Sequence, residues 1–300
     1  MMKSGFIAII GRPNVGKSTF LNTVIGKKIA IMSNKPQTTR NTISGVLTTE
    51  DYQMIFIDTP GIHKPHNELG KRMTNSAYSS TRGVDAILWM IGANEKFGVA
   101  EEMIIVNLKN SKTPVYLVIN KIDLLKNKTD IDKLILQYQE KYDFAGFYPI
   151  SAILNQNINH LLDDLVELLP EGPQYYPENM ITDHPERFLI AEIIREKVLM
   201  FTEEEVPHSV AVTIEALKKN DENPSVMDCY ANIYVERKSQ KGIIIGAQGA
   251  MLKKIGSAAR KEIINILGTK VYLEIWVKVK EDWRNSNVAL KVLGYDIDNF

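Results

Sequence analysis

The sequence predicts an α/β domain built on a doubly wound, mostly parallel sheet, followed by a smaller α+β domain. Short apolar, β-branched runs alternate with stretches of helical spacing in the first half of the chain. A proline-rich stretch follows, and beyond it the pattern becomes helix, strand, strand, short helix, helix and strand. A chain of 300 residues exceeds the usual size of one domain, so we expect two.

The domain boundary is predicted from four prolines, which are Pro170, Pro173, Pro177 and Pro185. Prolines at this density favour an extended, semi-rigid linker. We therefore expect a first domain over residues 1–172, a linker over 173–185 and a second domain over 186–300.

The composition limits the possible classes of function but does not identify one. The formal net charge is zero, so whole-chain charge neither favours nor excludes a nucleic-acid partner. A single cysteine, Cys229, cannot form an internal disulfide, which indicates a reducing compartment. We see no signal peptide and no apolar run of membrane-spanning length. We expect a cytoplasmic protein, with peripheral contact at the inner face of the cell membrane left open.

The strongest motif lies near the start of the chain. Phe6 to Ile10 is predicted to be a buried strand and Thr19 to Ile25 a helix, and between them the sequence fits G-x-x-x-x-G-K-S. Glycines let backbone amides turn around phosphates at a helix N-terminus, whereas a plain glycine turn is the competing interpretation. Lys17 is expected to reach the terminal phosphates, and Ser18 to bind magnesium. The expected nucleotide contacts here are Gly11, Asn14, Val15, Gly16, Lys17, Ser18 and Thr19.

Two further segments are expected to meet the γ-phosphate and its metal. The polar stretch from Met32 to Ser44 is predicted to be a mobile loop, and Thr39, or else Thr38, would complete the magnesium shell. After a predicted strand at Met54 to Ile57, the sequence continues Asp58-Thr59-Pro60-Gly61. Asp58 is placed to hold magnesium and Gly61 to turn its amide toward the phosphate. Thr59 and Pro60 complete this expected contact segment, for which an ordinary β-turn is the alternative.

The base is expected to be guanine. Strands are predicted at Ala86 to Ile91 and Val115 to Ile119, and the second ends in Asn120-Lys121-Ile122-Asp123. Guanine presents two hydrogen-bond donors on one edge, and the Asp123 carboxylate can accept from both. Adenine does not offer such a pair of donors. Asn120 would tether the neighbouring loop and the base, and the Lys121 stem would lie along the base. A helix cap is the alternative for this tetrapeptide taken alone.

A fifth strand is predicted at Phe147 to Ile150. It ends in Ser151-Ala152, whose amides are expected near the guanine carbonyl. Apolar residues at helical spacing between Ile158 and Leu168 predict the helix that closes the domain.

Together these motifs resemble the translation-factor-related (Era/TrmE-like) class of GTPases, and within it the Era family of KH-domain GTPases. The resemblance rests on Gly11 to Ser18, Gln37 to Arg40, Asp58 to Pro65, Asn120 to Asp123 and Ile150 to Ala152. It implies a P-loop GTPase that uses GTP or GDP and Mg²⁺, with Lys17, Thr39 and Gly61 as catalytic residues and Ser18, Thr39 and Asp58 as metal ligands.

One position bears on the rate of hydrolysis. Ras-like proteins place a water-orienting glutamine directly after the D-x-x-G glycine, where this chain has Ile62. An apolar side chain cannot orient water, so hydrolysis must depend on Lys17, the metal and loop amides. We therefore expect slow intrinsic turnover.

The second domain is predicted to contain a helix at Arg187 to Phe201, strands at Ser209 to Leu217 and Tyr230 to Lys238, a helix at Ala250 to Leu267 and a strand at Val271 to Lys280. This order, with Gly246-Ala247-Gln248-Gly249 before the long helix, resembles a type II KH domain. In that fold the G-x-x-G loop admits a nucleic-acid backbone and an apolar groove takes unstacked bases.

Charge supports an RNA-binding face around this loop. From Arg237 to Lys261 there are seven lysines and arginines and no aspartate or glutamate. A solvated basic face is the plainer explanation, but beside a G-x-x-G loop we favour a surface that follows phosphates. The expected RNA contacts are Arg237, Lys241, Gly246, Ala247, Gln248, Gly249, Lys253 and Lys254. Trp276 and Trp283 are expected to pack rather than to stack on bases.

The resemblance implies 16S ribosomal RNA near its 3′ end as the partner, together with the 30S ribosomal subunit precursor, and a monomeric protein that acts in small-subunit assembly. The alternative is an RNA clamp that nucleotide stabilises and in which hydrolysis is incidental. Tandem-domain ribosome GTPases are disfavoured because the chain has one phosphate loop, and tRNA-modifying relatives because it has no cysteine near its end.

Overall fold

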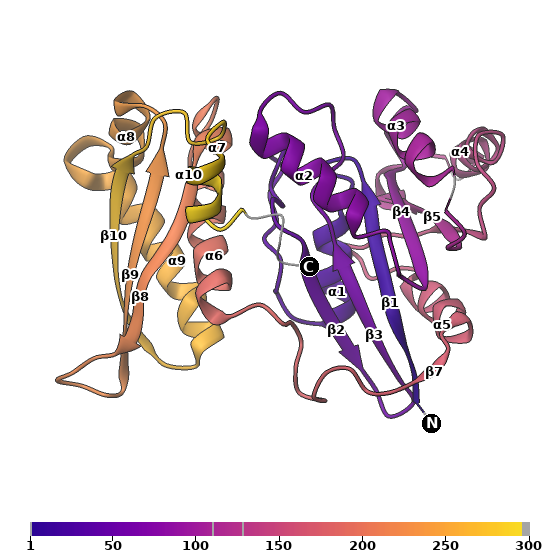
Figure 1. The fold of residues 1–300 in the computed structure, drawn as a ribbon, viewed down its shortest axis with the longest axis horizontal. Coiled ribbons are helices and arrows are strands. Elements are labelled where there is room, and N and C mark those ends of the chain that lie inside the picture. The colour runs from indigo at the N-terminus through magenta and orange to yellow at the C-terminus, as the bar shows by residue number, and fades with distance from the viewer. Residues whose placement is uncertain (1, 110, 128, 296–300) are drawn as a thin grey trace. The chain divides into compact units, whose positions relative to one another are not determined.

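The computed structural model describes residues 2–109, 111–127 and 129–295, so the last five residues of the predicted second domain lie outside the described residues. The chain forms two compact units (Figure 1). The first comprises residues 1–30, 39–66 and 70–183, and the second comprises residues 31–38, 67–69 and 184–300. Two short segments from the first half of the chain therefore belong to the second unit.

The first unit contains a sheet of seven strands in the order β2-β3-β1-β4-β5-β6, with β7 paired to β1. The β2–β3 and β1–β7 pairs are antiparallel and the other pairs are parallel. This arrangement confirms the predicted doubly wound, mostly parallel sheet. The strands are β1 (Met2–Gly11), β2 (Ile43–Thr48), β3 (Tyr52–Asp58), β4 (Ala86–Gly92), β5 (Val115–Asn120), β6 (Gly146–Pro149) and β7 (Glu171–Gly172).

Helices cover both faces of this sheet. On one face, α2, α3 and α4 supply Ala77, Ile104 and Tyr138 to a core that surrounds the fully buried Trp89. On the other face, Phe20 of α1 packs against Phe56 of β3. The helices of this unit are α1 (Lys17–Ile25), α2 (Glu68–Ser79), α3 (Val99–Leu108), a 3₁₀ turn (Ile122–Leu124), α4 (Thr129–Gln139) and α5 (Ile158–Leu168).

Strand β2 differs from the sequence prediction, which placed a polar loop as far as Ser44. Residues Ile43 and Ser44 instead begin β2, where they pair with Asp58 and Ile57 of β3. The polarity of this segment concealed an edge strand whose first four residues, 43–46, are all buried.

The stretch predicted to be a linker packs along the first unit. The Gln53 carboxamide accepts hydrogen bonds from the backbone amides of Tyr175 and Tyr176 and donates one to the Tyr176 carbonyl. Farther on, the Ile181 carbonyl accepts from the Val46 amide at 2.9 Å. Because of these contacts the first unit extends to Asp183, eleven residues beyond the predicted end at Gly172.

The second unit is a three-stranded sheet of order β10-β9-β8, in which β9 is parallel to β10 and antiparallel to β8. Its core joins the inner face of the sheet to α6, α8 and α9. This confirms the predicted α+β domain. The elements are α6 (Glu186–Phe201), α7 (Val206–Ser209), β8 (Ala211–Lys219), β9 (Val226–Val235), α8 (Lys238–Ile245), a 3₁₀ turn (Ala247–Gly249), α9 (Ala250–Leu267), β10 (Lys270–Val279) and α10 (Asn287–Val292).

The two tryptophans of this region have different environments. Trp283 is fully buried and donates its indole N–H to the Ser209 carbonyl at 2.9 Å, as the packing prediction requires. Trp276 is 55% exposed, so the same prediction was wrong for it, because its position on β10 faces away from the helices.

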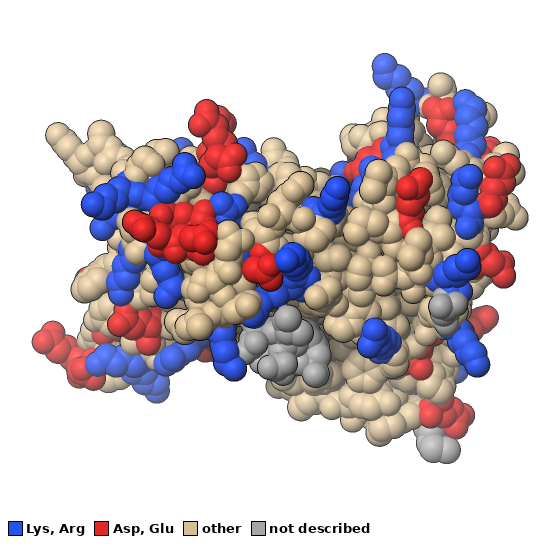
Figure 2. All heavy atoms as spheres, turned by 45° about the horizontal axis from the view of Figure 1, so that its top comes forward, with Lys and Arg blue, Asp and Glu red and all other residues tan. Residues whose placement is uncertain are grey.

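The surface carries charges of both signs. Figure 2 shows lysine and arginine side chains interspersed with aspartate and glutamate over the face in view, in keeping with the zero net charge. Among the described residues, no helix is both long and apolar enough to cross a bilayer.

Candidate functional site

The first candidate site is the loop between β1 and α1, where glycines create backbone that other residues would not adopt. Gly11 has a φ of 149°, and a Cβ there would lie 2.2 Å from the Met90 carbonyl oxygen. Gly16 has a φ of 101°, and its Cβ would lie 2.2 Å from Nδ2 of Asn120. No side chain caps the N-terminus of α1, which begins at Lys17. The loop thus leaves helix amides available to an anion.

Lys17 is buried inside this loop. Its Nζ donates to the carbonyl oxygens of Gly11 at 3.2 Å and Arg12 at 2.8 Å. Burial lowers the pKa of Lys17 to about 8, although the nearby Asp58 carboxylate opposes that shift. An anionic phosphate group beside the ammonium would favour its charged form.

Three side chains predicted to hold a metal ion meet at one point. The Ser18 hydroxyl donates to Oδ2 of Asp58 at 2.7 Å and lies 2.9 Å from Oγ1 of Thr39. The other Asp58 oxygen, Oδ1, is buried and has no hydrogen-bond partner among the described residues. Burial raises the pKa of Asp58 to about 6, so the carboxylate needs a cation to stay charged at low cost. Hydroxyl and carboxylate oxygens suit Mg²⁺, and this donor set fits it.

The choice between Thr38 and Thr39 follows from their side chains. Oγ1 of Thr38 donates to the Lys35 carbonyl at 2.6 Å, which holds it within its own loop. Oγ1 of Thr39 instead reaches Ser18. The geometry therefore favours Thr39 as the metal ligand.

The segment after β3 lies against the phosphate loop. A Cβ at Gly61 would lie 2.5 Å from the Pro13 nitrogen, so glycine is required for this approach. Thr59 is fully buried, and its hydroxyl donates to the Ile9 carbonyl at 2.7 Å, which makes its role structural in this geometry. Pro60 is also buried beside it. Ile62 is fully buried in the core and cannot contact a water molecule at the phosphates.

The predicted base-recognition residues form one connected network. Asn120 donates from Nδ2 to the Val15 carbonyl at 2.8 Å and accepts from the Ala152 amide at 2.9 Å, so it links two loops as expected. The Ser151 hydroxyl donates to Oδ1 of Asp123 and orients this exposed carboxylate. Nζ of Lys121 donates to the Asn14 carbonyl.

The amides of Ser151 and Ala152 both have partners inside the protein. Ser151 donates to the Gln156 carbonyl at 3.2 Å, and Ala152 donates to Asn120. In this geometry the pair sets Asn120 and Asp123, and the expected contact of its amides with the guanine carbonyl stays a prediction. Thr19, in the first turn of α1, supplies the carbonyl that accepts from Thr23.

Sequence reasoning missed one supporting ion pair. Arg12 of the phosphate loop is paired with Glu101 at the start of α3, and Glu101 is 2% exposed. The same Glu101 carboxylate accepts from the Gly98 amide at 2.9 Å. The pair ties the phosphate loop to the β4–α3 connection, and no local pattern in the sequence marks it.

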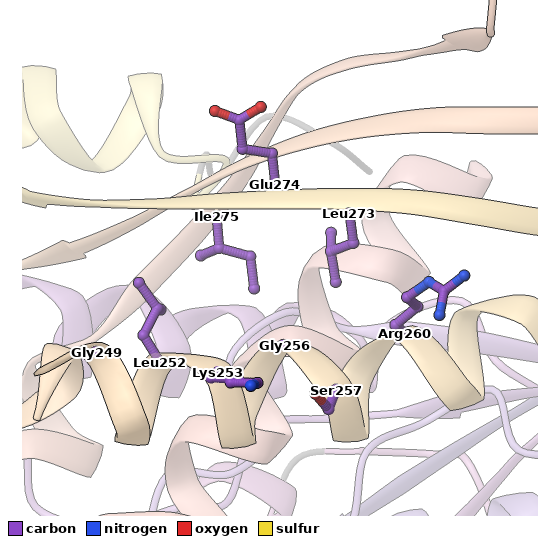
Figure 3. A pocket seen from close by; sticks show the side chains of 9 residues that line it. All are labelled: Gly249, Leu252, Lys253, Gly256, Ser257, Arg260, Leu273, Glu274 and Ile275. Atoms are coloured by element: carbon purple, nitrogen blue, oxygen red, sulfur yellow. The ribbon is translucent and has the colours of Figure 1, made fainter.

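The second candidate site is a groove of about 420 Å³ between α9 and β10 in the second unit. Figure 3 shows Leu273 and Ile275 pointing from β10 toward the helix, whereas Glu274 points to the other side of the strand. The full lining is Gly249, Leu252, Lys253, Gly256, Ser257, Arg260, Leu273, Glu274 and Ile275. Apolar walls with Lys253 and Arg260 at the helix side suit an unstacked base with its phosphates.

The loop before the groove has the strained backbone that the G-x-x-G pattern predicts. Gly246, Gln248 and Gly249 have φ values of 71°, 50° and 78°. A Cβ at Gly246 would lie 2.7 Å from Met251 Cβ, whereas nothing lies within 4 Å of one at Gly249. No side chain caps α9, which begins at Ala250, so its N-terminal amides face the loop.

Of the eight residues predicted to contact RNA, Gly249 and Lys253 line the groove. Lys254 lies 4.3 Å from the Phe201 ring centroid and so is engaged with the end of α6. Gly246, Ala247 and Gln248 form the preceding loop, Arg237 is the residue directly before α8, and Lys241 lies within α8. The sequence places Leu252 in the apolar stripe of the long helix, and the predicted RNA contacts did not include Gly256 or Arg260. A glycine inside the apolar stripe of a long helix was the signal for the groove.

Comparison with known proteins agrees with both sites. Residues 6–121 match a family model described as a 50S ribosome-binding GTPase, and residues 205–284 match one described as a KH domain. A crystal structure of Era in complex with MgGDPNP and nucleotides 1506–1542 of 16S ribosomal RNA is similar over 98% of this chain and 99% of that chain. Its sequence identity to this chain is 44%, with a TM-score of 0.96. A variant of Aquifex aeolicus Era bound to GDP·AlF₄⁻ is 43% identical over the same shares, with a TM-score of 0.93.

Proposed function

The chain belongs to the Era family of GTPases, and from this premise we propose that it is a GTP-driven switch that binds 16S ribosomal RNA near its 3′ end and acts on the 30S subunit precursor during small-subunit assembly. The observation that carries this proposal is the presence of two complete sites in one chain. Ser18, Thr39 and Asp58 converge beside the phosphate loop, and an apolar groove with basic side chains follows the G-x-x-G loop. The relative with both ligands bound matches nearly the whole chain.

At the nucleotide site the protein's task is to position and to stabilise charge. Lys17 and the first amides of α1 bind the β- and γ-phosphates, and Asp123, oriented by Ser151, selects guanine. Ser18, Thr39 and Asp58 would hold Mg²⁺, which neutralises charge that develops on the transferred phosphoryl group. Gly61 presents its amide to the γ-phosphate. The burial of Ile62 supports slow intrinsic hydrolysis, since this side chain cannot orient water.

At the RNA site the groove takes bases and the loop takes the backbone. Leu252, Leu273 and Ile275 offer apolar surface to unstacked bases, while Lys253 and Arg260 flank it with positive charge. The groove lies within the matched KH region.

The cellular setting belongs to the same proposal. We place the protein in the cytoplasm as a monomer, and the buried, unpaired Cys229 supports a reducing compartment. Flotation with lipid vesicles tests peripheral contact with the membrane, and sedimentation with 30S precursors tests the assembly role.

The central experiment measures the affinity of the full chain for a short strand from the 16S rRNA 3′ end, with GDPNP and then with GDP. We expect tighter binding with GDPNP and loss of binding when Gly249→Asp places a carboxylate beside the RNA backbone. Gly268→Asp is the matched control, because Gly268 has a φ of 64° at the opposite end of α9 and also has nothing within 4 Å of an added Cβ. Equal RNA affinity with both nucleotides would contradict the switch and favour a clamp in which hydrolysis is incidental.

A further inference from the structure

Helix α6 carries an unusual set of buried charges. Glu192, Arg195 and Glu196 are 7%, 1% and 3% exposed, and their spacing places them on one face of the helix. Removing charged groups from water is costly, so each must be compensated by partners. The Arg195 guanidinium donates to both Glu192 oxygens, through Nε at 2.8 Å and Nη2 at 2.6 Å.

This charge set also holds a piece of distant sequence. Arg195 Nη2 donates to the Thr38 carbonyl oxygen, and Oε1 of Glu196 accepts from the Met32 amide at 2.9 Å. Both contacts lie within the second unit, which includes residues 31–38. The two ends of this short segment are therefore fixed to neighbouring positions of one helix.

The contact at Thr38 affects the nucleotide site through the backbone. The Thr38 carbonyl belongs to the peptide plane that leads into Thr39, so a bond to that oxygen fixes the plane from which Thr39 starts. The Thr38 side chain is held as well, by the Lys35 carbonyl. Thr39 then reaches Ser18 at 2.9 Å. No contact between the two units is needed for this link, because the chain itself crosses from one unit to the other between Thr38 and Thr39.

We propose that Arg195 is a positioning residue for GTP hydrolysis, which holds the Thr38 carbonyl so that Thr39 can close on the magnesium site. The inference rests on the proposed role of Thr39. Arg195 also connects this event to RNA, since α6 packs against α9, whose N-terminus follows the G-x-x-G loop. We call residues 31–38, when they are held by Arg195 and Glu196, the docked segment. Binding of GTP favours this docked state, and by linkage the docked state favours binding of GTP over GDP.

The charge of Arg195 is compensated by Glu192, with Glu196 and Tyr295 also close to it. The bond to Thr38 is additional, and Nη1 of Arg195 is buried with no partner among the described residues.

The test uses the full chain with Arg195→Lys, which keeps the charge and loses the fork that reaches both Glu192 and Thr38. We expect GDP affinity to stay within about twofold, and GDPNP affinity and single-turnover hydrolysis to fall about tenfold, the effect of one charge-assisted hydrogen bond. The gain in RNA affinity with GDPNP over GDP should shrink in the same variant. Unchanged GDPNP affinity and hydrolysis would overturn the proposal.

Two controls separate positioning from folding. Glu236→Gln breaks the half-buried Arg284–Glu236 pair of the same unit without touching residues 31–38, so it should leave both nucleotide affinities unchanged. If Arg195→Lys lowers the melting temperature, the double variant Glu192→Leu/Arg195→Met removes the pair without leaving an unpaired charge and should give the same loss of GDPNP affinity. A loss of GDP and GDPNP affinity by equal factors would overturn the proposal.

A double-mutant cycle with Thr39→Ala decides whether Arg195 acts through Thr39. We expect Arg195→Lys to have no further effect on GDPNP affinity once Thr39 is alanine. Additive losses would overturn the inference and leave Thr39 as a metal ligand. No effect of Thr39→Ala by itself would instead refute the role of Thr39, on which the inference rests.

Discussion

The nucleotide site and the RNA groove each have a glycine with positive φ directly before an uncapped helix, but the space around the two glycines differs. Gly16 precedes α1 and Gly249 precedes α9, both with positive φ and with no side chain capping the helix. A Cβ at Gly16 would meet Asn120 at 2.2 Å, whereas nothing lies within 4 Å of one at Gly249. The first helix end is enclosed and suits a ligand of fixed shape. The second is open and suits a strand that runs past it.

The largest expected effect comes from an added methyl group at the enclosed site. Gly16→Ala strains the left-handed backbone and drives Cβ into Asn120, which also holds the Val15 carbonyl. We expect the affinity for GDP and GDPNP, measured by titration, to fall at least about 100-fold, because backbone strain and the lost tether add together. The control is Gly26→Ala at the other end of α1, where φ is 71° and the space is open. This control variant should lose some stability but keep its affinity for GDP and GDPNP.

The corresponding change at the open site should have a smaller effect. Gly249→Ala meets the backbone strain without the clash, so RNA affinity should fall by about tenfold or less. If Gly249→Ala weakened RNA binding as severely as Gly16→Ala weakens nucleotide binding, the contrast between an enclosed and an open helix end would be refuted.

The next effect concerns the floor of the groove. Gly256 lies within α9 and lines the groove, and a Cβ there would lie 3.6 Å from Ile275 Cδ1. Gly256→Leu should fill the space between helix and strand and lower RNA affinity about tenfold in a binding titration, while nucleotide affinity stays unchanged. Gly242→Leu is the matched control, since Gly242 is a helical glycine of α8 with nothing within 4 Å. RNA binding that Gly256→Leu leaves intact would mean that bases do not enter this groove.

The same contrast explains what the sequence could predict. At the enclosed site, chemistry depends on backbone geometry next to strand ends, so Gly11 to Ser18, Asp58 and Asn120 could be located by pattern alone. At the open site, the groove depends on packing between α9 and β10. Leu252, Leu273 and Ile275 have the periodicity of core residues, and their partial exposure is a tertiary property.

Contacts between distant segments were also beyond the sequence. Gln53 holds Tyr175 and Tyr176, which converts a proline-rich stretch from a spacer into part of the first unit. The Arg12–Glu101 pair joins residues that no local motif relates. Likewise, strand β2 was hidden because its pairing with β3, rather than its composition, makes it a strand.

The last expected effect is a pH dependence that arises in the second unit. Cys229, the one cysteine of the chain, is fully buried on β9, and burial raises the pKa of its thiol to about 11. The unfolded thiol ionises near its ordinary pKa of 9.0, so ionisation favours the unfolded state as pH rises from about 9 to 11. Below pH 9 the thiol contributes no pH dependence.

Denaturant unfolding of the second unit at several pH values tests this effect through the difference between the protein and Cys229→Ala. We expect the free energy of unfolding of the protein to fall by up to about 2–3 kcal/mol more than that of the variant between pH 9 and 11, the value of two pKa units.

Since the first unit carries no thiol, alkylation of Cys229 by iodoacetamide at pH 8 reports opening of the second unit alone. The RNA strand should slow this reaction by stabilising that unit. GDP should slow it less than GDPNP, because the docked segment at residues 31–38 couples GTP to the second unit. If GDP and GDPNP slowed the alkylation of Cys229 equally, the difference between the two nucleotides would not reach the second unit.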